Sequence, residues 1–217
     1  MRVTYYLEVL SSWCHWAEPT WTELQARYAG RVQFDWKIAL MRPQDFPISP
    51  EQADWFYRRS GTIARSPYML SNGWLEAPGF DYAMPNLVAE AARSLGASGD
   101  IVRLALTDAA VREGRKIGRL DEAVSVAAAA GQLTPEQLRA RAISPEIRTT
   151  VDASTAAFHA LQITQRPAFV LEDPIGDRAV FSGLIQFAPL AATIDAMLAD
   201  TFAYAAHRAH FGEPPSA

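Results

Sequence analysis

The alternation of apolar and polar residues predicts strands at both ends of the chain. Residues 2–10 (RVTYYLEVL) and 31–40 (RVQFDWKIAL) are rich in β-branched and aromatic side chains. The segment between them places Trp21, Leu24 and Tyr28 on one face of a helix. A strand, a helix and a strand in this order form a βαβ unit, so the two strands are expected to be parallel.

Helical periodicity dominates the middle of the chain, and strands return only near its end. The expected helices cover 51–64, 84–96, 100–114, 121–130, 133–142 and 143–163, the late strands 166–173 and 177–183, and the last amphipathic helix 187–198. A two-stranded unit cannot cover both faces of its sheet alone. We therefore expect an α/β fold in which both ends of the chain build one mixed sheet, with the helical block inserted as a lid.

This order also predicts the domain organisation. We expect residues 1–45 and 160–200 to form one domain in two halves and 46–159 to form a helical insertion domain. Residues 201–217 are expected to form a C-terminal helix and a frayed tail.

Composition narrows the classes of function. The chain has 217 residues, 49% of them hydrophobic, and a formal net charge of −4, which supports a real core and gives no basic field for nucleic acid. No run of apolar residues is long enough for a membrane span, and the N-terminus has no secretory signal pattern. A single cysteine cannot build an internal disulfide. Together these features predict a cytoplasmic protein.

That single cysteine, Cys14, lies in the stretch VLSSWCHWAEPTW, between the first strand and the first helix. Amides and the dipole at a helix N-terminus stabilise a thiolate, so we expect the pKa of Cys14 to fall below about 8.5. A protonated His15 would lower it further. The alternative is that Cys14 is a small hydrophobe of the core. The other histidines show no metal-ligand pattern, so no metal is expected.

Three stretches resemble the DsbA-like branch of the thioredoxin superfamily. They are SSWCHWA at the end of the first strand, the run from 113 to 183, and RAVFSGLIQFAPL near the C-terminus. The branch includes FrnE-type oxidoreductases, kappa-class glutathione transferases and hydroxychromene-carboxylate isomerases. The resemblance covers nearly the whole chain and implies a thioredoxin-like mixed β-sheet with a large all-helical insertion.

The resemblance implies a site around Cys14 and His15 as catalytic residues. The substrate-binding residues that it implies are Ser12, Trp13, Trp16, Ala17, Arg166, Pro167, Ser182 and Gly183. Ala17 stands where the branch often has a second cysteine, so a mixed disulfide at Cys14 would need an outside thiol such as glutathione. Relatives that use glutathione carry an acidic pattern after the last strand, which this chain lacks at Ser182 and Gly183.

In thioredoxin folds the proline before a late strand follows a cis peptide bond and exposes the preceding backbone to substrate. Here that bond would join Arg166 and Pro167. The guanidinium of Arg166 is expected beside Cys14, where it would lower the pKa of the thiol and bind a carboxylate of glutathione or substrate. The alternative is an ordinary trans proline that opens an edge strand. We also interpret Arg58 and Arg59 as a solvated pair rather than an anion site.

Three hypotheses about function remain open. The first is a DsbA-like thiol–disulfide oxidoreductase that uses Cys14 as a lone nucleophile, with no tightly bound cofactor and glutathione as the candidate co-substrate. The second is a glutathione-dependent isomerase or transferase that acts on an aromatic small molecule. The third is a non-catalytic thioredoxin-like binding domain, because fold does not choose among these functions. The partner is then a small thiol or an aromatic small molecule, and the pattern allows a homodimer without requiring one.

Overall fold

A mixed sheet lies at the centre of the computed structural model, which describes residues 1–77, 80–97 and 99–212. Its four strands are β1 (Arg2–Leu7), β2 (Gln33–Ile38), β3 (Ala168–Glu172) and β4 (Arg178–Ser182), in the order β2-β1-β3-β4. β1 is parallel to β2 and antiparallel to β3, and β3 is antiparallel to β4. Both ends of the chain therefore share one sheet, as the sequence predicts.

Successive tyrosines of β1 point to opposite faces of this sheet, as strand geometry requires. Tyr5 stacks on Phe169 with ring centroids 4.8 Å apart and contacts Trp21 of α1 (Ser12–Arg27). On the other face, Tyr6 packs with Phe158 of α7 (Pro145–Ala160). Each face is thus covered by a helix from a different part of the chain.

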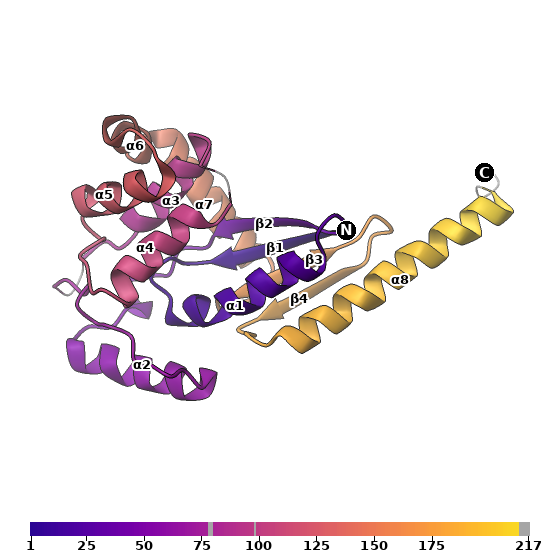
Figure 1. Ribbon diagram of the computed structural model, residues 1–217, viewed down its shortest axis with the longest axis horizontal. Coiled ribbons are helices and arrows are strands. Elements are labelled where there is room, and N and C mark those ends of the chain that lie inside the picture. Colours follow the sequence, from indigo (N-terminus) through magenta and orange to yellow (C-terminus); the bar gives the residue numbers. More distant parts are fainter. Residues whose placement is uncertain (78–79, 98, 213–217) are drawn as a thin grey trace.

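The helical insertion lies between β2 and β3. It consists of the short 3-10 helix Pro43–Asp45, α2 (Pro50–Ala64), α3 (Met84–Ser94), α4 (Ile101–Val111), α5 (Leu120–Gly131), α6 (Pro135–Ala142) and α7. Helices α3 to α7 gather at one end of the sheet, whereas α2 lies to the side of α1 (Figure 1). The insertion expected from the helical periodicity is confirmed.

The differences from the expected bounds that matter most lie at the start of the chain and at its last helix. The first strand ends at Leu7 rather than residue 10, and α1 begins at Ser12 with Ser11 as its N-cap. The last helix, α8 (Phe187–Phe211), runs well past residue 198 and projects beyond the sheet (Figure 1). An alanine-rich stretch with no glycine before Gly212 explains this continuity. The tail expected to fray begins at His210, which is helical, and residues 213–217 lie outside the described part.

Among the helices of the described residues, none has the length and apolar character needed to cross a bilayer.

Candidate active site

The N-terminal tip of α1 opens onto the larger of two cavities described here. Ser11 is the N-cap, and its hydroxyl accepts a hydrogen bond from the Cys14 amide at 3.3 Å. The serine is favoured at this position because its side chain satisfies an amide that has no intrahelical acceptor. The helix tip is therefore occupied by Ser11, Ser12 and Trp13, while Cys14 is the third residue of the helix and its side chain is buried.

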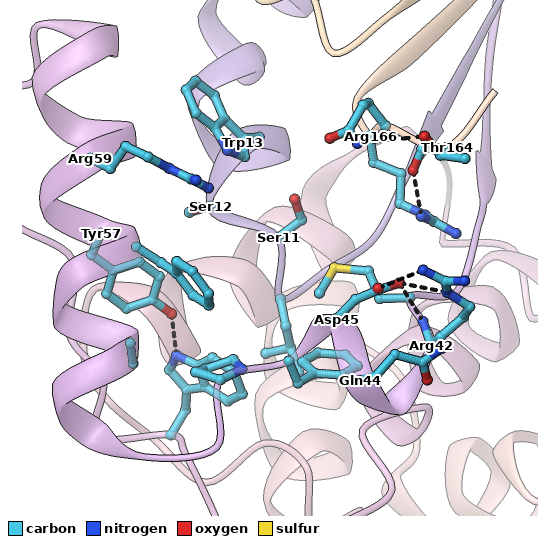
Figure 2. A pocket seen from close by; sticks show the side chains of 18 residues that line it. Ser11, Ser12, Trp13, Arg42, Gln44, Asp45, Tyr57, Arg59, Thr164 and Arg166 are labelled. Carbon is cyan, nitrogen blue, oxygen red and sulfur yellow. Dashed lines mark hydrogen bonds and ion pairs between the residues drawn. The ribbon is translucent and has the colours of Figure 1, made fainter.

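The cavity at the tip has a volume of about 460 Å³. Its walls come from the start of α1, the segment after β2, the α2 region and the segment before β3 (Figure 2). The lining residues used below are Ser11, Ser12, Trp13, Arg42, Phe56, Tyr57, Arg59, Trp74 and Arg166. The fold thus brings together three of the expected site residues, Ser12, Trp13 and Arg166.

The Cys14 thiol does not have the environment that the sequence predicts. Its side chain is only 3% exposed, and the residue lies outside the cavity lining in the described part of the chain. Burial raises the pKa of Cys14 to about 11, and the negative charges of Glu8 and Glu18 act in the same direction. Hydrogen bonds to Ser11 and to the Glu8 backbone oppose this shift without cancelling it. The expected low pKa is therefore wrong, because burial outweighs the helix N-terminus.

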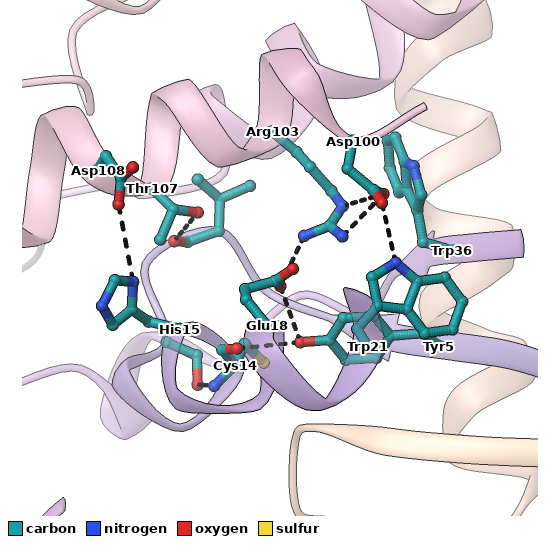
Figure 3. A network of polar contacts seen from close by, with 12 residues as sticks. Tyr5, Cys14, His15, Glu18, Trp21, Trp36, Asp100, Arg103, Thr107 and Asp108 are labelled. Carbon is teal, nitrogen blue, oxygen red and sulfur yellow. Dashed lines mark hydrogen bonds and ion pairs between the residues drawn. The ribbon is translucent and has the colours of Figure 1, made fainter. Parts of the chain in front are cut away.

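His15 faces the helical insertion rather than the cavity. One ring nitrogen lies 3.0 Å from the Tyr68 hydroxyl, and the other lies 3.8 Å from Asp108 (Figure 3). Burial lowers the pKa of His15, so the ring is less readily protonated than a free histidine. The structure therefore does not support the expectation that a protonated His15 assists the thiol.

Arg166 lines the cavity, but its guanidinium is already engaged. It donates to the carbonyls of Ala39 and Leu40, at the end of β2, and packs over the ring of Phe158 at 4.4 Å. Burial lowers the pKa of Arg166. This side chain joins the segment before β3 to the end of β2, and the structure does not support the expected role of carboxylate ligand.

The Arg166–Pro167 peptide bond is cis, as the sequence predicts. Two other expected site residues hold this segment in place: Ser182 donates its hydroxyl to the Gln165 carbonyl at 3.2 Å, and the Gly183 amide donates to the Pro167 carbonyl at 2.8 Å. Gly183 has φ +76, and an added Cβ would lie 3.2 Å from the Gln165 side chain. Ser182 and Gly183 therefore hold in place the segment before β3, which forms one wall of the cavity.

The remaining expected residues pack under the site. Ala17 is fully buried, so the position expected for a second cysteine faces the core. Trp16 donates its indole N–H to the Ser60 hydroxyl at 3.1 Å and contacts Tyr68, which attaches α2 to α1. Neither residue lines the cavity within the described chain.

A polar network lies beneath the first helix. Arg103 of α4 is 2% exposed and donates to Glu18 at 2.6 Å and to Asp100 at 2.9 Å (Figure 3). The Tyr5 hydroxyl lies 3.1 Å from both Glu18 and the Cys14 carbonyl oxygen. Burial raises the pKa of Glu18, and the charge of Arg103 opposes that shift. The network joins α4 to the helix that carries the site.

Sequence reasoning gave no place in the site to several of the cavity residues, and Ser11 and Arg59 are the most consequential of them. Ser11 lies at the tip where Cys14 was expected, and the signal was available, since a serine before a helical run is a favoured N-cap. Arg59, interpreted as solvated, extends toward Ser12 and stacks over Trp55 and Phe56 at 4.9 and 5.4 Å (Figure 2). Nothing in the sequence places α2 opposite the tip of α1, so the second residue could not have been found.

Within the described residues, no group of three or more histidine, cysteine or acidic side chains is arranged to hold a metal ion.

Comparisons with known proteins identify the fold. No family model and no curated protein matches the chain. A candidate protein disulfide isomerase from Nitrosomonas europaea superposes with a TM-score of 0.75 at 16% identity, over 92% of this chain and 98% of that one. The cytosolic disulfide reductase DsbM from Pseudomonas aeruginosa gives a TM-score of 0.71 at 20% identity, over 91% of this chain and 98% of that one. A second structure of DsbM, with GSH, gives 0.70 at 20% identity, over 91% and 99%.

These proteins share little sequence with the chain, so the likeness shows the fold. The oxidoreductase NmDsbA1 from Neisseria meningitidis superposes less closely, with a TM-score of 0.56 at 14% identity over 92% of this chain and 82% of that one. The protein therefore has the DsbA-like form of the thioredoxin fold, as the resemblance implies. Its activity must be argued from the site itself.

Proposed function

We propose that the protein is a thiol–disulfide oxidoreductase whose attacking thiol is supplied by a bound small thiol of the glutathione class. The proposal depends on one contrast, between the buried thiol of Cys14 and the open cavity in which the thiol of a ligand would bind. The cavity at the tip of α1 is large enough for a small ligand, at about 460 Å³, whereas Cys14 is buried beneath it. This retains glutathione as co-substrate and moves the nucleophile from Cys14 to the ligand.

The tip of α1 has the chemistry to hold a thiolate. The amides of Ser12 and Trp13 belong to the first turn and have no intrahelical acceptor, and the helix dipole adds partial positive charge there. The Ser11 oxygen accepts from the Cys14 amide, and a hydroxyl that accepts a hydrogen bond still has a proton that it can donate to a sulfur anion at the tip. A thiol bound at this tip would have a lowered pKa.

Arg59 is the cation best placed to bind a carboxylate of such a ligand. Of the three arginines in the lining, Arg42 is paired with Asp45 at 3.0 Å and Arg166 is engaged by backbone carbonyls. No ion pair of Arg59 occurs within the described residues, and its side chain extends toward the tip of α1 (Figure 2). An arginine suits this role because its guanidinium can form two parallel bonds to a carboxylate.

The proposed reaction is balanced by two equivalents of thiol. The bound thiolate attacks one sulfur of a substrate disulfide, a new sulfur–sulfur bond forms, and the substrate's other sulfur leaves as a thiolate that takes up a proton. A second small thiol attacks the mixed disulfide and releases the substrate thiol and the oxidised small thiol. The substrate gains two electrons, so the direction is reductive, and we propose the cytoplasm, where glutathione is reduced, as the compartment.

A second candidate is favoured by the aromatic lining. Trp13, Phe56 and Trp74 line the cavity, and the same thiolate could attack an electrophilic carbon of an aromatic substrate. This would make the protein a glutathione-dependent isomerase or transferase. Measuring oxidised glutathione separates the candidates, because only disulfide reduction produces it in proportion to turnover.

The proposal is tested with glutathione binding and with reduction of a small disulfide. We expect Cys14→Ala to keep most of the glutathione-dependent rate, and Arg59→Ala to weaken glutathione binding about tenfold or more, as loss of a charged hydrogen bond does. Arg58→Ala is the matched control, since both arginines are exposed but only Arg59 lines the cavity in the described chain. Loss of the rate in Cys14→Ala would instead return the nucleophile to Cys14. Binding without any turnover would identify a binding domain.

A further inference from the structure

A buried carboxyl group lies directly before the tip of α1. Glu8 follows β1 and is 1% exposed. One carboxyl oxygen accepts from the Asn86 side-chain amide at 2.5 Å, and the other accepts from the Leu10 backbone amide at 2.9 Å. The Asn86 oxygen in turn accepts from the Val9 amide at 3.0 Å. The Glu8 and Asn86 side chains therefore fix the two backbone amides that precede Ser11.

The backbone of Glu8 also contacts the tip. Its carbonyl accepts a hydrogen bond from the Ser11 amide at 3.1 Å. A second bond from the insertion joins the same loop, since the Thr107 hydroxyl of α4 donates to the Val9 carbonyl at 3.0 Å. The position of Ser11 thus depends on contacts from both α3 and α4.

The groups around Glu8 determine the pH at which its carboxyl group ionises. Burial raises the pKa of Glu8 to about 7, while the bonds from Asn86 and Leu10 and the charge of Arg166 oppose the rise. The other titratable groups near it are Cys14 of α1 and Tyr57 of α2. A cavity of about 220 Å³ that Glu8 lines is also lined by three titratable residues, Asp81, Tyr82 and Arg148. Burial raises the pKa of Cys14 and of Tyr57 well above the neutral range, whereas it brings the pKa of Glu8 to about 7.

We propose that Glu8 is a positioning residue of the thiol site, which holds the tip of α1 through Val9 and Leu10 when ionised and releases it when protonated. A carboxylate accepts both bonds, whereas a protonated carboxyl group has one oxygen that also carries a donor and competes with the amide facing it. The effect on ligand binding rests on the proposed function: glutathione binding should strengthen as the pH rises through the neutral range.

The inference is tested first without any ligand, by following backbone amide resonances against pH in the full chain. The Leu10 and Ser11 amides should shift with a midpoint near 7 in the wild type, and this step should be absent in Glu8→Gln. Thr107→Val is the matched control: it removes the other bond to the loop but no titratable group, so it should retain the step. Amides that do not titrate in the neutral range, or that titrate equally in Glu8→Gln, would overturn the inference.

A second variant covers the case in which Glu8→Gln does not fold. The Asn86 bond lowers the pKa of Glu8, so Asn86→Ala should move the midpoint of the amide step to higher pH, and an unmoved midpoint would contradict the inference. Glutathione binding is then measured by calorimetry at about pH 6 and about pH 8. We expect the gain in affinity at the higher pH to be severalfold larger in the wild type than in Glu8→Gln, where only the ionisation of the bound thiol contributes. Glutathione that binds at neither pH, with the amide step intact, would defeat the proposed function and leave the role of Glu8 standing.

Discussion

At the scale of single residues, the reactivity of Cys14 follows from its burial. A thiol with a pKa of about 11 is almost wholly protonated at neutral pH, and the thiolate is the reactive form. We expect iodoacetamide to label native Cys14 far more slowly than it labels free glutathione at the same pH, and the rate should rise with pH up to the alkaline range. Labelling in urea is the control, since the unfolded chain exposes the thiol. Rapid labelling of the native protein near neutral pH would contradict this prediction.

Glu8 makes folding stability depend on pH. Its pKa rises from an ordinary value of 4.5 to about 7 in the folded state, so the folded protein binds the proton more tightly than the unfolded chain does. Stability should therefore be highest below pH 4.5 with respect to this group and fall as the pH rises through 7, by up to about 3 kcal/mol. Urea unfolding at about pH 5 and about pH 8 should show a smaller difference in Glu8→Gln than in the wild type. Equal differences would show that Glu8 does not carry this dependence.

The predictions about single residues differ in the kind of sequence signal that supported them. The cis bond at Pro167 was implied by the family resemblance of the residues around it. Ser182 and Gly183 were expected to bind substrate, and in the structure they hold the segment of the cis bond through contacts with residues distant in the sequence. The helix start was misplaced, because SSWC contains two serines that can cap a helix, and the choice of Ser11 turns Cys14 inward. A shift of this size decides whether a side chain lines a cavity or joins the core.

At the scale of elements, α4 is fastened to α1 by a buried charge. Arg103 donates to Glu18 of α1 at 2.6 Å, and both side chains are largely shielded from solvent. We expect Arg103→Ala to lower the free energy of unfolding by about 3–5 kcal/mol, because it leaves the carboxylate of Glu18 buried without its partner. The measurement is urea unfolding followed by circular dichroism.

A surface ion pair gives the comparison. Arg27 of α1 and Asp195 of α8 lie 2.9 Å apart, with side chains 49% and 46% exposed. Removing an exposed pair costs about 0–1 kcal/mol, so Arg27→Ala should cost several times less than Arg103→Ala. Similar losses in the two variants would mean that the buried network does not fasten α4 to α1.

The elements and the sheet that both ends of the chain share were predicted, whereas the approach of α2 to the tip of α1 was not. Each expected helix and strand is present, since hydrophobic periodicity and proline or glycine boundaries are local signals. The approach of α2 to the tip of α1 depends on contacts between residues far apart in sequence, such as Trp16 with Ser60. Arg59 lies in the site only because α2 approaches the tip of α1. The sequence around Arg59 therefore gives no sign of this role.

At the scale of the whole molecule, α8 extends past the body of the protein. Residues 202–211 are exposed, and their large apolar side chains include Phe202, Tyr204 and Phe211, at 64–76% exposure. We expect a chain that ends at residue 201 to keep the melting temperature of the full chain within about 2 °C, because little apolar surface is buried there. A larger fall, measured by circular dichroism, would show that this segment is covered in solution, and sedimentation of the full chain would then reveal whether a second copy covers it.

The bonds from Asn86 and Thr107 to Val9 restrict how the molecule can admit a ligand. If the bundle of α3 to α7 moved away as one rigid body, it would displace the turn that carries Ser11. The geometry of the binding site would then be lost while the ligand enters. The route in must therefore leave that bundle in place, and α2, joined to α1 by the bond from Trp16 to Ser60, is a wall of the cavity that could move independently of it. The rate of ligand entry and release would then depend on how often α2 moves away from α1, rather than on a hinge between two domains.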